Sequence, residues 1–168
     1  MDSLNHWNEL SNAERREAAR GWCGADRFSR TLGDHGPLAC IEDAHRQADE
    51  CFDSFTDQDW LEAFASHPRL GDVKSLQMKF VGNRQWSADE QSGTDAADPE
   101  LLQRLAEWNE KYFQRFGHIF ILKATGVTAT QMVRAIEQRL TNSPEDERRI
   151  AADHQRQITH LRIDKFFQ

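Results

Sequence analysis

Hydrophobic residues recur along most of this chain at the three- and four-residue steps that place side chains on one face of an α-helix. The clearest run lies between Asp98 and Gly117. Runs that favour β-strands are scarce. The pattern therefore predicts a helical protein, and the apolar face of the helix expected over residues 99–116 consists of Leu101, Leu105, Trp108, Tyr112 and Phe116.

Start signals divide the rest of the chain into helices. A Ser or Thr followed three residues later by an acid or Gln is typical of a capping box, in which the two side chains bond to backbone N–H groups of the first turn. An N-cap residue followed by proline is a second such signal. The starts found in this way are Ser11, Thr56, Ser87, Asp98, Thr128 and Ser143. A further helix is expected over about 38–52.

Three stretches depart from this pattern. Residues 25–37 contain Gly33, Gly36 and Pro37, so we predict a loop there. The apolar run 119–122 fits a buried strand-like segment or a buried helical turn equally well. Residues 73–86 support no more than a short helical piece.

The helix expected after Ser143 completes the fold prediction. Its predicted apolar face contains Ile150, Ile158 and Leu161, with Arg162 at the edge. There is no internal repeat and no linker long enough to divide two domains. We therefore predict an all-α protein with a single compact domain over residues 1–168 and about seven or eight helices.

Composition and charge exclude several classes of function. The net charge is −7 over 168 residues, which argues against nucleic acid and anionic membrane surfaces as partners, because both attract basic faces. No apolar stretch approaches the roughly 18 residues of a membrane span. The cysteines Cys23, Cys40 and Cys51 lack Cys-x-x-Cys spacing, and the N-terminus lacks a secretory pattern. We expect a cytoplasmic protein.

The loop that contains His67 and Pro68 is the first candidate for chemistry. Proline disfavours helical geometry in the residue before it, so Pro68 would hold His67 extended at the end of a short helix. An imidazole with a fixed direction can transfer protons near neutral pH. The alternative is a purely structural turn, in which Arg69 and Asp72 pair across the loop.

Glu90 and Arg162 are further candidates, each with a structural alternative. Glu90 completes a capping box with Ser87, but a carboxylate there could instead orient an imidazole. Gln91 could bind an amide-like or ureido group. Arg162 could extend to solvent, or bind a carboxylate through two parallel hydrogen bonds. The other histidines show no metal-ligand spacing, the nearest in sequence being His154 and His160, so no metal site is predicted.

Several motifs occur in an order that resembles one family. They are His-Pro-Arg-Leu-Gly-Asp from His67, Ser87-x-x-Glu90-Gln91-Ser92-Gly93, Asn109-x-x-Tyr112-x-x-Arg115-Phe116-Gly117, Phe120-Ile121, Arg139-Leu140, Glu147 and Leu161-Arg162-Ile163. This set resembles the 2-oxo-4-hydroxy-4-carboxy-5-ureidoimidazoline (OHCU) decarboxylases of urate breakdown. The resemblance implies an all-α, cofactor-free enzyme, usually a homodimer, that converts OHCU to (S)-allantoin.

The resemblance also implies roles for individual residues. His67 corresponds to the catalytic acid or base and Glu90 to its orienting partner. Two neighbouring positions depart from the family pattern, because Phe-Gly-Phe-Pro-Phe is replaced here by Phe-Gly-His-Ile-Phe over residues 116–120. The implied substrate contacts are Pro68, Ser87, Ala88, Asp89, Gln91, Phe120, Ile121, Leu122, Lys123, Ala124 and Arg162.

Two other functions fit the residues without the resemblance. A helical interaction module would use His67-Pro68 only as a turn and the aromatic residues as core or interface. A hydrolase of a related ureide would use His67 and Glu90 to activate water.

Overall fold

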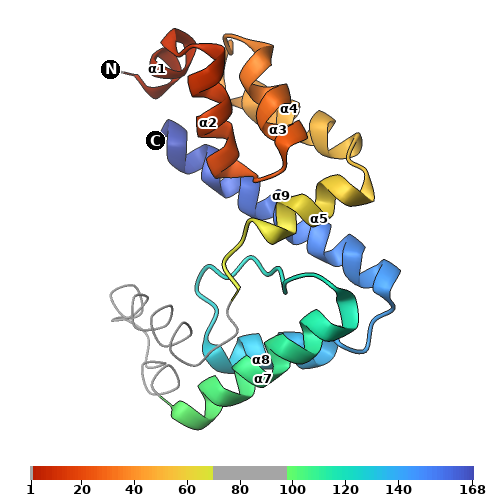
Figure 1. Cartoon of the computed structure of the whole chain (residues 1–168). Helices are drawn as coiled ribbons and strands as arrows, with labels where there is room; N and C mark the ends of the chain where they lie inside the picture. The colour runs from red at the N-terminus through yellow and green to blue at the C-terminus, as the bar shows by residue number, and fades with distance from the viewer. Residues whose placement is uncertain (1, 70–97) are drawn as a thin grey trace. The chain divides into compact units, whose positions relative to one another are not determined.

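The computed structural model describes residues 2–69 and 98–168. These residues form eight helices and no strand, which confirms the all-α prediction (Figure 1). The predicted helix after Ser87 and the piece within 73–86 lie outside the described residues. No helix in the described part is long and apolar enough to cross a membrane. The chain forms two compact units, Met1–His67 with Ala152–Gln168 (unit 1) and Pro68–Ala151 (unit 2).

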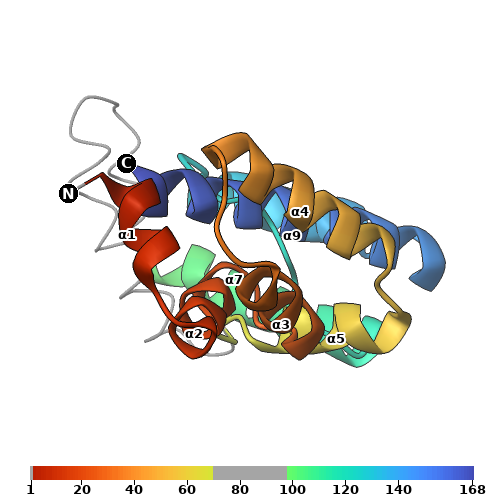
Figure 2. The same ribbon diagram turned by 90° about the horizontal axis from the view of Figure 1, so that it is seen from above.

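Unit 1 is built from five N-terminal helices and the larger part of the last helix. Its core contains Trp7 stacked on Trp22, with ring centroids 4.9 Å apart, and Phe28 stacked on Phe52 at 5.2 Å. In Figure 2 the fourth helix lies alongside the last one. The helices are α1 (Ser3–Glu9), α2 (Asn12–Trp22), α3 (Asp26–His35), α4 (Ile41–Asp53), α5 (Asp57–Ala65) and α9 (Pro144–Phe167).

The predicted loop over residues 25–37 is wrong, because α3 occupies most of it. Phe28, Ser29 and Leu32 are buried along one face of this helix. Gly33 marks a close approach to α2, since a Cβ atom built on it would lie 2.7 Å from the backbone nitrogen of Arg16. Gly33 allows two helices to pack closely, whereas the sequence pattern attributes this glycine to a loop.

Replacement of Gly33 by alanine is expected to destabilise the protein by roughly 1–3 kcal/mol, because the added methyl group must push the backbone of α2 away. Gly21→Ala is the matched control. Gly21 lies in α2 with nothing within 4 Å of the added Cβ, so alanine should stabilise the helix by about 0.4–1 kcal/mol. Urea unfolding of both variants measures the difference, and equal effects would contradict the packing explanation.

Helix α4 begins three residues later than the predicted start at Leu38. The side chain of Asn8 explains the delay, because it takes both backbone polar groups of Leu38. Its Nδ2 donates to the carbonyl of Leu38 at 2.9 Å, and its Oδ1 accepts from the amide of Leu38 at 2.7 Å. These bonds compete with the first turn of a helix at this position.

Unit 2 contains α7 (Pro99–Phe116), α8 (Ala129–Arg139) and the first turns of α9. Gly117 ends α7 in the left-handed conformation, with φ of 74°. Of the apolar face predicted for α7, Leu105 and Tyr112 are fully buried, and Leu101, Trp108 and Phe116 pack at the edge. Residues 119–124 form neither the strand-like segment nor the helical turn that the sequence left open.

The predicted apolar face of α9 is wrong. Ile150, Ile158 and Leu161 are only partly buried. The buried residues instead recur every four positions, and three of the six are polar. They are Glu147, Ala151, Gln155, Thr159, Ile163 and Phe167.

Candidate active site

His67 lies in unit 1 immediately after Ser66, the residue that caps the C-terminus of α5, and His67 is half-buried. Its amide donates to the carbonyl of Phe64 at 3.2 Å, which continues the end of the helix. Gly24 allows this end to pack closely, since a Cβ atom on Gly24 would lie 2.2 Å from Cβ of Ser66. The close contact with Ser66 fixes the backbone from which the imidazole projects.

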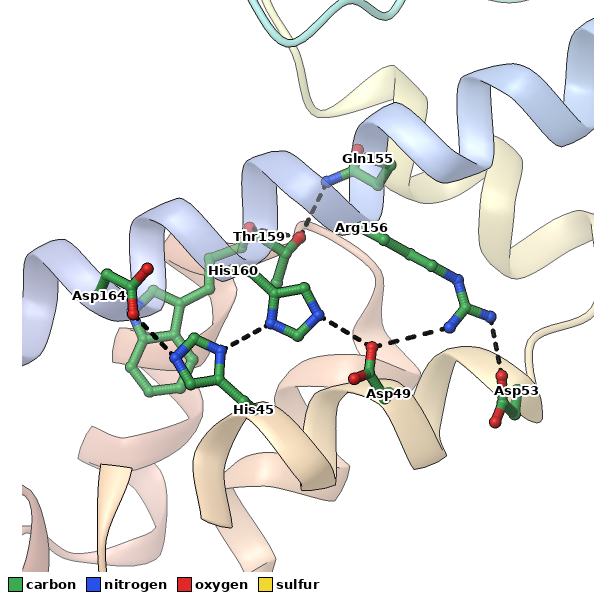
Figure 3. Close-up of polar contacts among 9 residues, drawn as sticks. His45, Asp49, Asp53, Gln155, Arg156, Thr159, His160 and Asp164 are labelled. Carbon is green, nitrogen blue, oxygen red and sulfur yellow. Dashed lines mark hydrogen bonds and ion pairs between the residues drawn. The ribbon is translucent and has the colours of Figure 1, made fainter. Parts of the chain in front are cut away.

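A chain of hydrogen bonds connects the His67 ring to the buried face of α9. Nε2 of His67 lies 2.6 Å from Oε1 of Gln155. Nε2 of Gln155 donates to Oγ1 of Thr159 at 3.2 Å, and Thr159 donates to the carbonyl of Trp22 at 3.2 Å. Figure 3 shows the bond between Gln155 and Thr159. Both of these side chains are fully buried, with 0% exposure, so water does not compete for their bonds.

Arg162 reaches the same carbonyl of Trp22, to which its NH1 donates at 3.2 Å. Burial lowers the pKa of this guanidinium, which means that its charged form has lost part of its hydration. A half-buried cation that bonds to a backbone carbonyl retains donors suited to a carboxylate. The structure thus joins His67 and Arg162, two of the predicted site residues, to one polar chain.

The predicted contacts of residues 120–124 lie in unit 2, where Arg139 holds this segment. NH1 of Arg139 donates to the carbonyl of Ile121 at 2.7 Å, and its guanidinium lies 4.4 Å from the centroid of the Phe120 ring. The side chain of Ile121 is buried, whereas Leu122, Lys123 and Ala124 are partly exposed. Ile121 therefore anchors the segment and its neighbours carry the accessible groups.

A buried ion pair fixes Arg139 in turn. Nε of Arg139 donates to Oε1 of Glu147 at 2.7 Å. Glu147 also accepts from the hydroxyl of Tyr112 and, at 3.0 Å, from Nδ2 of Asn142. Glu147 has no exposed surface and Arg139 is 7% exposed. Burial, and secondly the bond to Glu147, raise the pKa of Tyr112. Three residues of the sequence motifs, Tyr112, Arg139 and Glu147, therefore have a structural role in this buried cluster.

His118 occupies one position where the family pattern changes. Its ring is buried against Tyr112 and Phe116, at centroid distances of 5.6 and 6.2 Å. Its Nδ1 lies 3.0 Å from the carbonyl of Ile119. Burial lowers the pKa of His118, so the ring serves as a neutral aromatic group in the core of unit 2.

Arg69 contacts two residues of α7. Its NH2 lies 2.5 Å from Glu110 on α7, and its guanidinium lies 4.1 Å from the centroid of the Phe113 ring. The predicted partner Asp72 lies outside the described residues, as do Ser87, Ala88, Asp89, Glu90 and Gln91. The predicted pairing of His67 with Glu90 therefore stays a prediction. Pro68 directly follows His67 and is exposed.

Sequence spacing also missed a contact between two histidines. Nδ1 of His45 on α4 lies 2.7 Å from Nδ1 of His160 on α9, as Figure 3 shows. Each ring faces a carboxylate with its other nitrogen, His45 at 2.8 Å from Asp164 and His160 at 2.9 Å from Asp49. Because His45 and His160 are 115 residues apart, no local motif reveals the pair. Among the described residues, no group of three or more side chains could hold a metal ion.

Arg156 on α9 also faces Asp49, with a nitrogen–oxygen distance of 3.8 Å.

The model of the OHCU decarboxylase family matches residues 8–164 of this chain. The chain belongs to the OHCU decarboxylase family. Among solved structures, it is similar to a crystal structure of OHCU decarboxylase in the presence of (S)-allantoin, with a TM-score of 0.71 and 34% identity, covering 88% of this chain and 95% of the other. A structure of (S)-allantoin synthase has a TM-score of 0.72 over 98% of this chain and 54% of the other, but the identity of 17% supports only the fold.

Curated relatives of this OHCU decarboxylase family chain include proteins with two activities. This chain is 36% identical over 145 residues to the uric acid degradation bifunctional protein TTL of Arabidopsis thaliana, and the match covers 86% of this chain and 45% of the relative. It is 25% identical over 155 residues to the OHCU decarboxylase of Haloferax volcanii, covering 92% of this chain and 80% of the relative. The chain thus spans less than half the length of the Arabidopsis protein.

The polar residues of α9 are the part of this decarboxylase-family site that sequence reasoning missed. Gln155 and Thr159 are four residues apart and in register with Ala151 and Ile163. That register was a usable signal, because a polar pair in line with small and apolar residues lies on the buried face. The prediction instead assigned the buried face to the side of α9 that carries the apolar residues Ile158 and Leu161, which are only partly buried.

Proposed function

We propose that this protein converts OHCU to (S)-allantoin, with His67 as the acid or base and Arg162 as the carboxylate-binding group. The protein is a carboxy-lyase of the OHCU decarboxylase family, which acts in urate degradation. The observation that carries the proposal for the site is the polar chain of unit 1, because it joins a half-buried imidazole and a half-buried guanidinium at the carbonyl of Trp22.

The chemistry of OHCU matches these groups. Its carboxylate is attached to a carbon next to a ring carbon–nitrogen double bond. When the carbon–carbon bond to the carboxylate breaks, carbon dioxide leaves and the electron pair moves into this neighbouring sink. A proton must then reach the ring carbon from one face, the ring nitrogen must gain one, and the substrate hydroxyl must lose one, so one proton is taken up from solvent overall. The protein therefore has to hold the carboxylate out of the ring plane, stabilise negative charge and move a proton.

His67 and Arg162 divide these tasks. A neutral imidazole can take the hydroxyl proton and return it to the ring, which gives one enantiomer if only one face is accessible. The guanidinium of Arg162, whose hydration is already reduced, gains more from an anionic ligand than an exposed arginine does. Glu90 is proposed as the orienting partner of His67. The remaining proposed substrate contacts are Pro68, Ser87, Ala88, Asp89, Gln91, Phe120, Ile121, Leu122, Lys123 and Ala124.

The proposal extends to the organisation of the protein. We infer one catalytic domain over residues 1–168, supported by a family match that continues through both units. We infer a homodimer from the family resemblance. We infer a cytoplasmic location from the three free cysteines, because cysteines stay reduced in that compartment. Light scattering on the eluting protein would give twice the chain mass of 19.4 kDa for a dimer, whereas a single-chain mass would contradict it.

The test of function uses OHCU generated in the cuvette by oxidation and hydrolysis of urate. The protein is expected to produce (S)-allantoin faster than spontaneous decay, which gives the racemate, and the excess is followed by circular dichroism. Racemic product at the background rate would overturn the proposal and favour an interaction module. Consumption of OHCU without (S)-allantoin would favour the ureide hydrolase.

A further inference from the structure

The polar chain that ends at His67 has a fixed direction. A backbone carbonyl only accepts hydrogen bonds, so the hydroxyl of Thr159 must donate its single proton to Trp22. Oγ1 of Thr159 is then left as the acceptor for the amide nitrogen of Gln155. This orients the Gln155 amide with Oε1 toward His67.

The orientation of the amide determines which nitrogen of His67 carries the proton. Oε1 of Gln155 only accepts, and it lies 2.6 Å from Nε2 of His67, so Nε2 must be the donor. We propose that Gln155 and Thr159 are positioning residues that hold His67 in its Nε2–H tautomer, so that Nδ1 is the nitrogen that takes up and returns the proton. The reactive role of Nδ1 rests on the proposed function, whereas the tautomer does not.

A buried amide suits this task. Because Gln155 and Thr159 have no exposed surface, the bonds do not exchange with water. The amide is neutral, so it orients the ring without adding a charge that would favour the imidazolium. Nε2 keeps its proton whether His67 is neutral or charged, so the same bond persists through the reaction. Gln155 thus holds Nε2 while Nδ1 changes its protonation.

The direct test is nuclear magnetic resonance of protein carrying ¹⁵N-labelled histidine, at a pH where His67 is neutral. The expected result is a protonated, pyrrole-type Nε2 and an unprotonated, pyridine-type Nδ1 for His67. The signals are assigned by their loss in His67→Asn. A wild-type ring protonated at Nδ1 would overturn the proposal, whatever the activity.

Variants at Thr159 separate positioning from simple packing. Thr159→Val removes the acceptor for Gln155, so the amide can rotate, and we expect a mixture of tautomers and a kcat lower by about 100-fold, with KM little changed. Thr159→Ser keeps the hydroxyl and should restore both the spectrum and the rate. If Thr159→Val lowers kcat while the His67 spectrum stays that of the wild type, the positioning role is overturned.

Gln155→Met provides the second comparison, with Gln157→Met on the exposed face of α9 as the matched control. Loss of the Nε2–H tautomer in the first variant, and its retention in the second, would support the proposal. Retention of the tautomer in both would overturn it. If the wild-type spectrum shows Nε2–H but His67→Asn retains full activity, the tautomer assignment stands and the catalytic role of His67 fails. The two failures are therefore distinguishable.

Discussion

Replacement of His67 by asparagine is expected to lower kcat for OHCU decarboxylation by roughly 10²–10⁴-fold, because asparagine can neither take up nor release a proton near neutral pH. The side chain is half-buried and lies at the end of α5, so the fold does not depend on its ring. Helical circular dichroism and the melting temperature should stay close to those of the wild type. The rate is measured as (S)-allantoin formed above the spontaneous reaction.

A second substitution at the same position controls for the hydrogen bond to Gln155. His67→Gln places an amide donor at about the reach of Nε2, so it can keep Gln155 bonded while still lacking an acid or base. Both variants should lose activity and keep the fold. His6→Asn, at an exposed position, should change neither. If the His67 variants unfold as they lose activity, the purely structural turn would be the better explanation.

Local signals correctly predicted several helix starts. The capping boxes that begin at Ser11, Thr56 and Thr128 are all formed, with reciprocal side-chain and backbone bonds. Their residues are three positions apart, so the interaction depends on nothing beyond the first turn. The N-cap at Asp98 and the helix end at Gly117 are confirmed for the same reason.

Contacts between distant residues were not predictable in the same way. Gly33 was read as a loop residue because its neighbour Arg16 belongs to another helix. The buried face of α9 was predicted wrongly because Gln155 and Glu147 are polar, and their partners, His67 and Arg139, lie outside α9. Polar residues that are buried with a partner look like surface residues in a sequence. In this protein those residues include the ones that hold the candidate site.

Replacement of Glu147 by alanine is expected to destabilise the protein by about 3–5 kcal/mol, because it leaves the guanidinium of Arg139 buried without its counter-charge. The hydroxyl of Tyr112 loses its acceptor in the same step. Urea unfolding measures the effect. Glu145→Ala, at an exposed position on the same helix, is the matched control and should stay within about 0.5 kcal/mol of the wild type. Similar losses in both variants would contradict the importance of the buried pair.

A double variant separates stability from positioning. Arg139→Met with Glu147→Leu removes both charges, so it should recover much of the stability that Glu147→Ala loses. It cannot recover the bond from Arg139 to the carbonyl of Ile121, or the contact with the ring of Phe120. We therefore expect a well-folded protein with a raised KM, because residues 120–124 lose their anchor. A stable double variant with wild-type KM would show that substrate binding does not depend on this segment.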